Sequence, residues 1–180
     1  MTQASEIAQL GAKVLRQHAD YVEEADNPNI RQIIADMKAA LAATLGVGLA
    51  APQISQLKRI IIVASRPSTR YPKAPLMQPT VMINPTFQAF SDDKEKDWEG
   101  CLSIPGIRAL VPRYKAINVQ YTDEIGNPVE QPLEGFVARV FQHEADHLDG
   151  KVYLDRVESS LDIISESKYF KLFNGMAVSL

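Results

Sequence analysis

The chain has 180 residues, 46% of them hydrophobic and 23% charged, and its formal net charge is −3. These values are ordinary for a globular protein, and the length suits one domain over residues 1–180 with a sizeable core. The weak negative charge predicts no general attraction to nucleic acid or to an anionic membrane. The single cysteine excludes an internal disulfide. With no secretory signal pattern and no apolar run of transmembrane length, we expect a cytoplasmic protein.

Helical patterns open the chain. The polar N-terminal segment allows a short helix near Ser5–Gln17. A stronger helix starts at Asn27-Pro28, because Asn is a good helix cap and Pro fits the first helical position. Its apolar residues recur at helical spacing, and the helix ends before Gly46. This face consists of Ile30, Ile33, Ile34, Met37, Leu41 and Leu45.

Short apolar or alternating runs then predict a series of strands. They span Arg59–Ala64, Thr80–Asn84, Thr86–Phe90, Arg108–Pro112, Ala116–Thr122, Val129–Leu133 and Lys151–Leu154. Prolines predict an exposed irregular loop over Arg66–Pro79, and Ser91–Asp97 reads as a charged surface turn. After Asp155 the pattern weakens. Asp162–Leu172 suits a mixed helix, and the tail from about residue 156 to residue 180 has no clear order.

A glycine-rich stretch, GVGLAAPQ, occupies positions 46–53. Two glycines and small side chains let the backbone approach a ligand or another segment closely. The stretch is not a phosphate loop, because no Lys-Ser/Thr follows the glycines. Taken alone, it favours a helix end followed by a tightly packed strand over a ligand site.

The most informative stretch is His143-Glu144-Ala145-Asp146-His147, inside a helical pattern over Phe136–Gly150. Residues four apart share one face of a helix, so the two imidazoles would aim at one point. Two neutral imidazoles are good ligands for a divalent transition metal. Glu144, one step round the helix, is placed to take a proton from a bound water. The alternative is a pair of hydrogen-bonded core histidines.

Cys101 follows a glycine in the stretch EGCLS, at positions 99–103. A free cysteine is usually a small buried hydrophobic residue, but beside a histidine pair a thiolate ligand is the sharper interpretation. Two histidines and one cysteine would leave the fourth position of a tetrahedral metal to water, as in catalytic sites. His18 lies in a polar segment without ligand spacing, and we interpret it as a surface residue.

Three stretches together resemble the signature motifs of the peptide deformylases: GVGLAAPQ (46–53), EGCLS (99–103) and QHEADH (142–147). They occur in the family's order, and the region that carries them covers most of the chain. The resemblance implies an α+β fold in which mixed or antiparallel strands surround a central helix carrying the histidine pair. It also implies a reaction, the removal of the formyl group from the N-terminal formylmethionine of new polypeptides with release of formate.

The resemblance also implies residue roles. Cys101, His143 and His147 would be the metal ligands, and Glu144 the general base and later the acid. The Gln53 side-chain amide and the Leu102 backbone N–H would stabilise the oxyanion. Gly48 would lie beside the substrate backbone. Ferrous iron would be the native ion, with Zn²⁺ or Ni²⁺ able to occupy the same site.

A methionine side chain needs an apolar slot near the metal, and Val47, Phe136 and Val140 are candidates for its walls. For Phe136 an ordinary core role is an equal alternative. Three polar residues near the motifs are candidates to orient the imidazoles. These are Glu99, Gln142 and Asp146. The stem of Arg139 should pack while its head reaches solvent or a carboxylate.

Two other functions remain open from the sequence. One is a general metallopeptidase, which commonly uses a third His or a Glu in place of Cys101. The other is a metal-binding domain without catalysis, for which Glu144 and Gln53 would have no purpose. The expected partners are formylmethionyl nascent chains. In some bacterial family members a basic C-terminal helix docks on the ribosome, but Asp155–Leu180 has four acidic and three basic residues and matches RNA poorly.

Overall fold

The structure is a computed structural model that describes residues 6–68 and 71–174. Within these ranges the chain forms three α-helices, eight strands and four short 3-10 helices. The helices are α1 (Pro28–Ala42), α2 (Gly135–Leu148) and α3 (Glu166–Asn174), and the 3-10 helices are η1 (Lys13–Arg16), η2 (Ala51–Ile54), η3 (Tyr153–Arg156) and η4 (Ser160–Asp162). The strands are β1 (Gly48–Ala50), β2 (Ile60–Ser65), β3 (Met77–Ala89), β4 (Lys94–Cys101), β5 (Ile104–Tyr114), β6 (Ala116–Thr122), β7 (Pro128–Glu134) and β8 (Ile163–Ser165).

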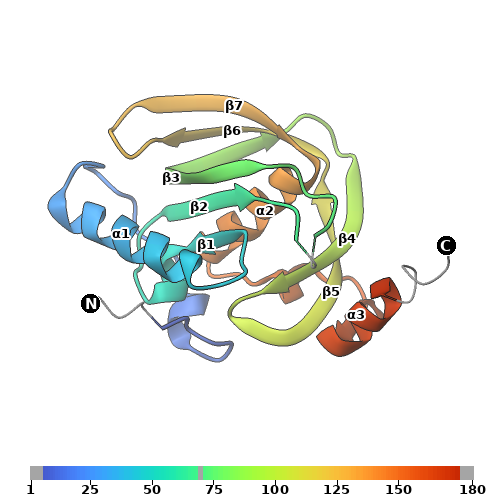
Figure 1. The fold of residues 1–180 in the computed structure, drawn as a ribbon. Helices are drawn as coiled ribbons and strands as arrows, with labels where there is room; N and C mark the ends of the chain where they lie inside the picture. Colours follow the sequence, from blue (N-terminus) through green and yellow to red (C-terminus); the bar gives the residue numbers. More distant parts are fainter. Residues whose placement is uncertain (1–5, 69–70, 175–180) are drawn as a thin grey trace.

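The strands form two antiparallel sheets, one in the order β1-β2-β3-β6-β7 and one in the order β4-β5-β8. Figure 1 shows α1 beside the β1 end of the larger sheet and α3 near β5. Helices and antiparallel sheets in one chain confirm the predicted α+β class.

The larger sheet separates two apolar cores. β2 lies between the two cores and contributes side chains to both, so all six of its residues are buried. Ile60 and Ile62 point toward α1, whereas Ile61 and Val63 join the core around α2. A strand covered on both faces has no polar alternation, which explains the continuous apolar run that predicted it.

The first helix forms as predicted. The side-chain oxygen of Asn27 accepts a hydrogen bond from the backbone N–H of Asn29 at 2.9 Å, and Pro28 occupies the first turn. The apolar face packs on β1, β2 and η2. The prediction is wrong for Leu45, which lies past the end of the helix and is 66% exposed.

The histidine helix α2 packs against strands of both sheets, including β1, β2 and β5. Because it is covered from several sides, the helix is buried from Ala138 to Glu144, and His147 is fully buried. Gly150 follows the helix with a positive φ of 69°. An added Cβ there would lie 2.8 Å from the backbone of Arg16, so the close approach of this segment requires glycine.

Several predicted elements differ from the structure. In place of the helix near Ser5–Gln17, the described part of that segment forms only η1. Its backbone is engaged elsewhere, because the N–H groups of Ala8 and Leu10 donate to the carbonyls of Gln53 and Ser103, both at 2.8 Å. Lys151–Leu154 is not a strand, because the side chain of Asp155 accepts from the N–H of Val152 and η3 begins there.

The two predicted strands on either side of Pro85 are one strand, β3, with a shift of register between Ile83 and Thr86. Asn84 at the shift has a positive φ of 51°, and its side-chain amide forms two hydrogen bonds with the backbone of Val22. The predicted loop and turn before β3 and β4 are shorter than expected, since these strands begin at Met77 and Lys94.

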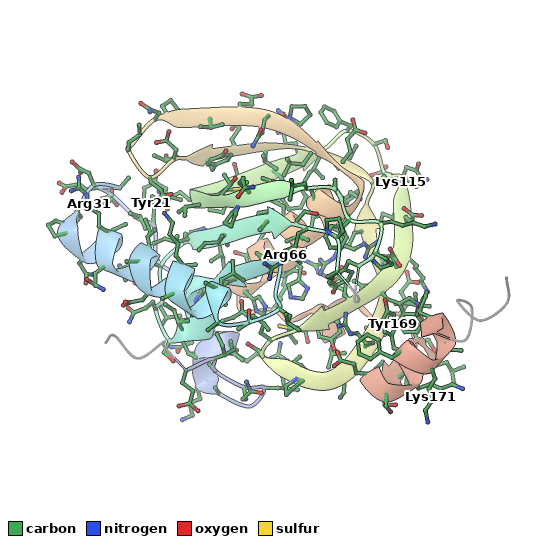
Figure 2. The ribbon with its side chains drawn as sticks, in the orientation of Figure 1. Tyr21, Arg31, Arg66, Lys115, Tyr169 and Lys171 are labelled. Atoms are coloured by element: carbon green, nitrogen blue, oxygen red, sulfur yellow. The ribbon has the colours of Figure 1, made fainter. Side chains whose placement is uncertain are left out.

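From residue 156 to residue 174 the C-terminal segment is more ordered than its sequence pattern indicates, and the rest of the predicted tail, 175–180, lies outside the described residues. β8 pairs with β5, and α3 follows it directly and packs on both. Figure 2 shows Tyr169 on the side of α3 that faces the strands and Lys171 pointing away from them. Tyr169 is buried accordingly. In the part of the chain that the structure describes, no helix is long and apolar enough to cross a membrane.

Candidate active site

The two histidines of α2 and the cysteine at the end of β4 meet in the interior. His143 and His147 lie one helical turn apart, with ring centroids 5.2 Å from each other. The Sγ atom of Cys101 lies 3.4 Å from Nε2 of His147. The three residues offer ligand atoms that all lie within 4.8 Å of one another, a spacing that suits one shared metal ion.

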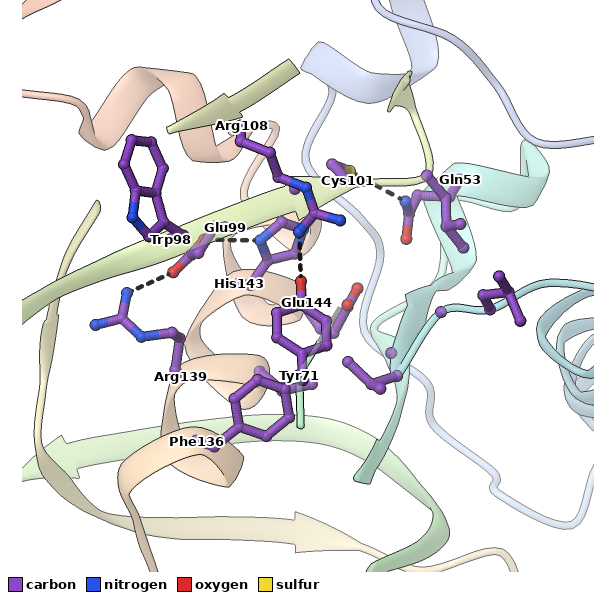
Figure 3. Close-up of a pocket in the computed structure, with 17 residues that line it drawn as sticks. Gln53, Tyr71, Trp98, Glu99, Cys101, Arg108, Phe136, Arg139, His143 and Glu144 are labelled. Atoms are coloured by element: carbon purple, nitrogen blue, oxygen red, sulfur yellow. Dashed lines mark hydrogen bonds and ion pairs between the residues drawn. The ribbon is translucent and has the colours of Figure 1, made fainter. Parts of the chain in front are cut away.

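Glu99 orients the first of these imidazoles. Its Oε2 atom accepts a hydrogen bond from Nδ1 of His143 at 2.9 Å, which leaves Nε2 as the ring nitrogen for the cluster. Arg113 and Arg139 donate to the other carboxylate oxygen at 2.9 and 3.0 Å (Figure 3 draws the Arg139 bond). Burial alone would raise the pKa of Glu99, but the charge of Arg113 and the His143 bond hold it well below its usual range.

The donor atoms fit a divalent transition metal. Burial alone would raise the pKa of the Cys101 thiol, but the neighbouring imidazoles of His147 and His143 lower it to about 5, so the sulfur is a thiolate at neutral pH. Nδ1 of His147 is buried without a hydrogen-bond partner among the described residues. One thiolate and two imidazoles suit Fe²⁺, Zn²⁺ or Ni²⁺, and three protein ligands keep a further position for water or substrate.

Glu144 lies one residue further along α2 and faces the backbone of β1. An added Cβ on Gly48 would lie only 2.3 Å from its Oε1 atom, so this close approach requires glycine. Glu144 is 4% exposed, and its Oε2 atom has no partner within the described part of the chain. Burial raises the pKa of Glu144 to about 7. Such a group can both accept and donate a proton near neutral pH.

Gln53 enters the site from η2 with a fixed amide. Its Oε1 accepts from the N–H of Ala50 at 2.9 Å, and its Nε2 donates to Oγ of Ser103 at 3.1 Å and faces Sγ of Cys101 at 3.5 Å. The side chain is 2% exposed. Leu102, next to the cysteine, also borders the cavity, and it packs on the core around α1.

A cavity of about 60 Å³ opens at this cluster. Its lining includes every residue to which the sequence analysis gave a metal, catalytic or substrate role except His147, which is fully buried. The predicted residues around the cavity are Val47, Gly48, Gln53, Cys101, Leu102, Phe136, Val140, His143 and Glu144. Motifs far apart in sequence therefore meet at one cavity, as a single site requires.

Sequence reasoning missed several large side chains around the cavity, among them Tyr71, Trp98 and Arg108. Tyr71 belongs to the proline-rich segment that was expected to be an exposed loop, and Arg108 lies in an alternating strand where an arginine normally faces solvent. Their contact partners come from segments distant in sequence, so no local sequence pattern predicts that these side chains line the cavity.

Of the three candidate orienting residues, only Glu99 contacts an imidazole. Gln142 instead binds the backbone of Tyr114, with its amide oxygen accepting at 3.0 Å and its amide nitrogen donating at 2.9 Å. Asp146 accepts from Arg113 and Arg156, both at 2.6 Å. Arg139 behaves as expected, because its head reaches the carboxylate of Glu99.

A helix with two histidines and a buried carboxylate, in which a thiolate lies beside the histidines at the edge of a small cavity, is the arrangement of a metal-dependent hydrolase. Comparisons with known proteins identify its family. The family model described as "Polypeptide deformylase" matches residues 4–162. A Nostoc sp. protein named peptide deformylase 2 is 54% identical over 92% of this chain and 93% of its own, and peptide deformylase 1 of Bordetella pertussis is 44% identical over 84% and 86%.

Solved structures agree. The Met-Ala-Ser-bound peptide deformylase of Acinetobacter baumannii has a TM-score of 0.84 and 40% identity, over 87% of this chain and 100% of that one. The actinonin complex of a Synechococcus elongatus peptide deformylase has a TM-score of 0.78 and 35% identity, over 99% and 90%. This chain belongs to the polypeptide deformylase family. It is an enzyme that depends on a metal ion and removes the formyl group from N-formylmethionyl peptides.

Proposed function

We propose that Cys101, His143 and His147 hold the metal ion, and that Glu144 is the general base and then the general acid of deformylation. The observation that carries this proposal is the cluster itself. Three donor atoms lie within 4.8 Å of one another, and the buried carboxylate of Glu144 borders the same cavity. A purely structural metal site would not need that carboxylate.

A divalent ion bound here would act as a Lewis acid, lowering the pKa of a water molecule toward about 7 and polarising the formyl oxygen. Glu144 accepts the proton of the attacking water, whose oxygen forms a bond to the formyl carbon. The same carboxyl group then donates this proton to the departing amine as the carbon–nitrogen bond breaks. A pKa of about 7, raised by burial, suits both halves of that transfer.

Gln53 and Leu102 are proposed to stabilise the negative charge that develops on the formyl oxygen. The amide of Gln53 cannot turn freely, because its oxygen is held by the N–H of Ala50. Its NH₂ group is thereby directed toward Cys101 and the cavity. The second donor would be the backbone N–H of Leu102. Donors fixed in this way act as the charge develops, and loss of one typically costs about 10²–10³ in rate.

The methionine side chain of the substrate is proposed to enter the slot between Val47, Phe136 and Val140. All three border the cavity beside the histidines. Gly48 would lie along the substrate backbone, since β1 is the edge strand of the larger sheet and its outer side lacks a neighbouring strand in the described sheet. We propose nascent formylmethionyl chains in the cytoplasm as the physiological substrates and residues 1–180 as one catalytic domain.

We propose ferrous iron as the native ion, with Zn²⁺ or Ni²⁺ as substitutes that the same donors accept. The thiolate and imidazoles do not discriminate strongly among these ions. We do not expect α3 to dock on the ribosome. That helix carries one acidic and two basic residues, Glu166, Lys168 and Lys171, which is too little positive charge for RNA.

The test of these roles is Glu144→Gln, which keeps the shape of the side chain and removes the base. We expect metal content to be unchanged and kcat for a formyl-Met peptide to fall by about 10²–10⁴. Glu134→Gln, at the exposed N-terminal cap of the same helix, is the matched control and should behave as wild type. Near-normal turnover by a metal-loaded Glu144→Gln protein would contradict the role of Glu144.

A further inference from the structure

A buried arginine lies at the rim of the catalytic cavity, and the chemical roles proposed above do not use it. The side chain of Arg108 is 1% exposed. Its Nε donates to Oε2 of Glu166 at 3.0 Å, and its Nη1 donates to the hydroxyl of Tyr71 at 2.9 Å. Its guanidinium lies 5.1 Å from the ring centroid of Tyr169. A buried guanidinium is costly unless it is paired, so these partners fix where it lies.

Arg108 also packs directly on the strand that carries the cysteine. An added Cβ on Gly100 would lie 2.8 Å from the central carbon of the guanidinium, so a larger residue at that position would displace the guanidinium. Gly100 immediately precedes Cys101. The position of Arg108 is thus coupled to the shape of the cavity beside the metal ligands.

Tyr71 connects this arginine to the proposed methionine slot. Its hydroxyl accepts the hydrogen bond from Arg108, and its ring centroid lies 4.8 Å from that of Phe136. Figure 3 shows Arg108, Tyr71 and Phe136 in succession along one side of the cavity. Tyr71, Arg108 and Phe136 all line the cavity, and we call them the outer wall.

The helix α3 supports this wall from behind. Glu166 in its first turn holds Arg108. Tyr169, one turn later, packs edge to face on Trp98 with ring centroids 5.7 Å apart, and Trp98 itself lines the cavity. The C-terminal segment is therefore packed against residues of the catalytic cavity.

The space behind this wall is small. A cavity of about 60 Å³ has room for only a few water molecules, so a displacement of one large wall side chain would change its fit to a substrate side chain. The outer wall is made by side chains from three separate segments, and a charged hydrogen-bond network connects two of them to α3.

We propose that Glu166 and Tyr71 are positioning residues that act through Arg108 to fix the outer wall, and thereby set how tightly the enzyme holds the side chain of the first substrate residue. This inference rests on the proposed function, because it takes Phe136 as a wall of the methionine slot. Under this proposal α3 contributes to substrate selection and does not serve to dock the enzyme on the ribosome.

Steady-state kinetics on formyl-Met-Ala-Ser and formyl-Ala-Ala-Ser test the proposal. Tyr71→Phe removes one hydroxyl, and Glu166→Ala removes the carboxylate that holds Arg108. Each should raise KM for the methionine peptide about five- to tenfold while kcat stays within about twofold. The preference for methionine over alanine, as a ratio of kcat/KM values, should fall by the same factor.

Controls separate this role from a general loss of structure. Glu166→Gln keeps an oxygen that can accept from Arg108 and should give a KM between those of wild type and Glu166→Ala. Tyr21→Phe alters an exposed tyrosine, and Glu158→Ala breaks a surface ion pair with Lys96, so both should retain the wild-type KM.

Coupling between the two positions is the sharpest test. If both act through Arg108, the double variant Tyr71→Phe/Glu166→Ala should raise KM no more than the larger single change. Multiplied effects, or single variants with wild-type KM and methionine preference, would overturn the proposal. Should Glu166→Ala fail to fold, Tyr71→Phe still decides, because it removes a single atom. A metal-loaded wild-type enzyme that releases no formate would instead refute the proposed function.

Discussion

Replacing Gly48 with alanine should displace the carboxylate of Glu144, the proposed general base, without changing any proposed metal ligand. The new Cβ would lie 2.3 Å from Oε1 and 2.8 Å from Cδ of Glu144, whereas ordinary contacts begin near 3.4 Å. The carboxylate must therefore move by about 1 Å. A misplacement of this size at a reacting group typically costs about 10²-fold in rate.

The assay is kcat for a formyl-Met peptide, measured together with metal content. We expect Gly48→Ala to keep one metal per chain and to lose about 10²-fold in kcat. Glu134→Gln, at the exposed N-terminal cap of α2, is the control and should keep the wild-type kcat. A Gly48→Ala enzyme with wild-type kcat would refute the claim that Glu144 acts from the position seen here.

Three further predictions concern the metal cluster. Loss of a residue that orients a metal ligand typically weakens metal binding by about 10–100-fold. Cys101→Ser removes a proposed ligand and should weaken Zn²⁺ binding by more than this, as a titration with Zn²⁺ would measure. An unchanged affinity would remove Cys101 from the ligand set. Glu99→Gln removes the charge that offsets Arg113 and Arg139 in the interior. Urea denaturation should reveal a loss of about 3–5 kcal/mol, and a loss below about 1 kcal/mol would contradict that account. Removal of the metal by a chelator should lower the free energy of unfolding by about 4 kcal/mol, if the metal was present at about 1,000 times its Kd. Added Ni²⁺ should restore this stability. A melting temperature that does not change with chelator would mean that the cluster holds no metal.

The meeting of Cys101, His143 and His147 could be predicted from the sequence, because metal coordination restricts both residue type and spacing. Four-residue spacing on a helix brings His143 and His147 together, and this follows from local geometry alone. The glycine of the first motif also has a physical reason in the structure, since Gly48 permits the close approach of Glu144. What the motif alone could not provide was the partner, because Gly48 and Glu144 are far apart in sequence.

Long-range partners also explain the elements that the sequence pattern missed. The N-terminal segment has enough apolar residues for a helix, but the backbone N–H groups of Ala8 and Leu10 donate to carbonyls of distant segments, those of Gln53 and Ser103. Pro85 predicted the end of a strand. The strand continues past it with a shift of register, and the side chain of Asn84 stabilises the shift by hydrogen bonds to the backbone of Val22. In both places a tertiary hydrogen bond outweighs local preference.

Arg108 is a further example of this limit. An arginine in an alternating strand usually faces solvent, so its burial could not be read from the pattern. It is buried because Glu166 and Tyr71 supply partners from α3 and from the segment before β3. The same applies to Glu99, whose two arginine partners lie on β5 and α2.

We propose that metal-dependent deformylation takes place in this cavity. The most direct measurement is formate release from formyl-Met-Ala-Ser by protein purified without oxygen, with its metal quantified and unformylated Met-Ala-Ser assayed beside it. We expect one metal ion per chain, formate and free Met-Ala-Ser in equal amounts, and no cleavage of either peptide bond. Peptide-bond cleavage, or a fully metal-loaded protein that releases no formate, would contradict the account.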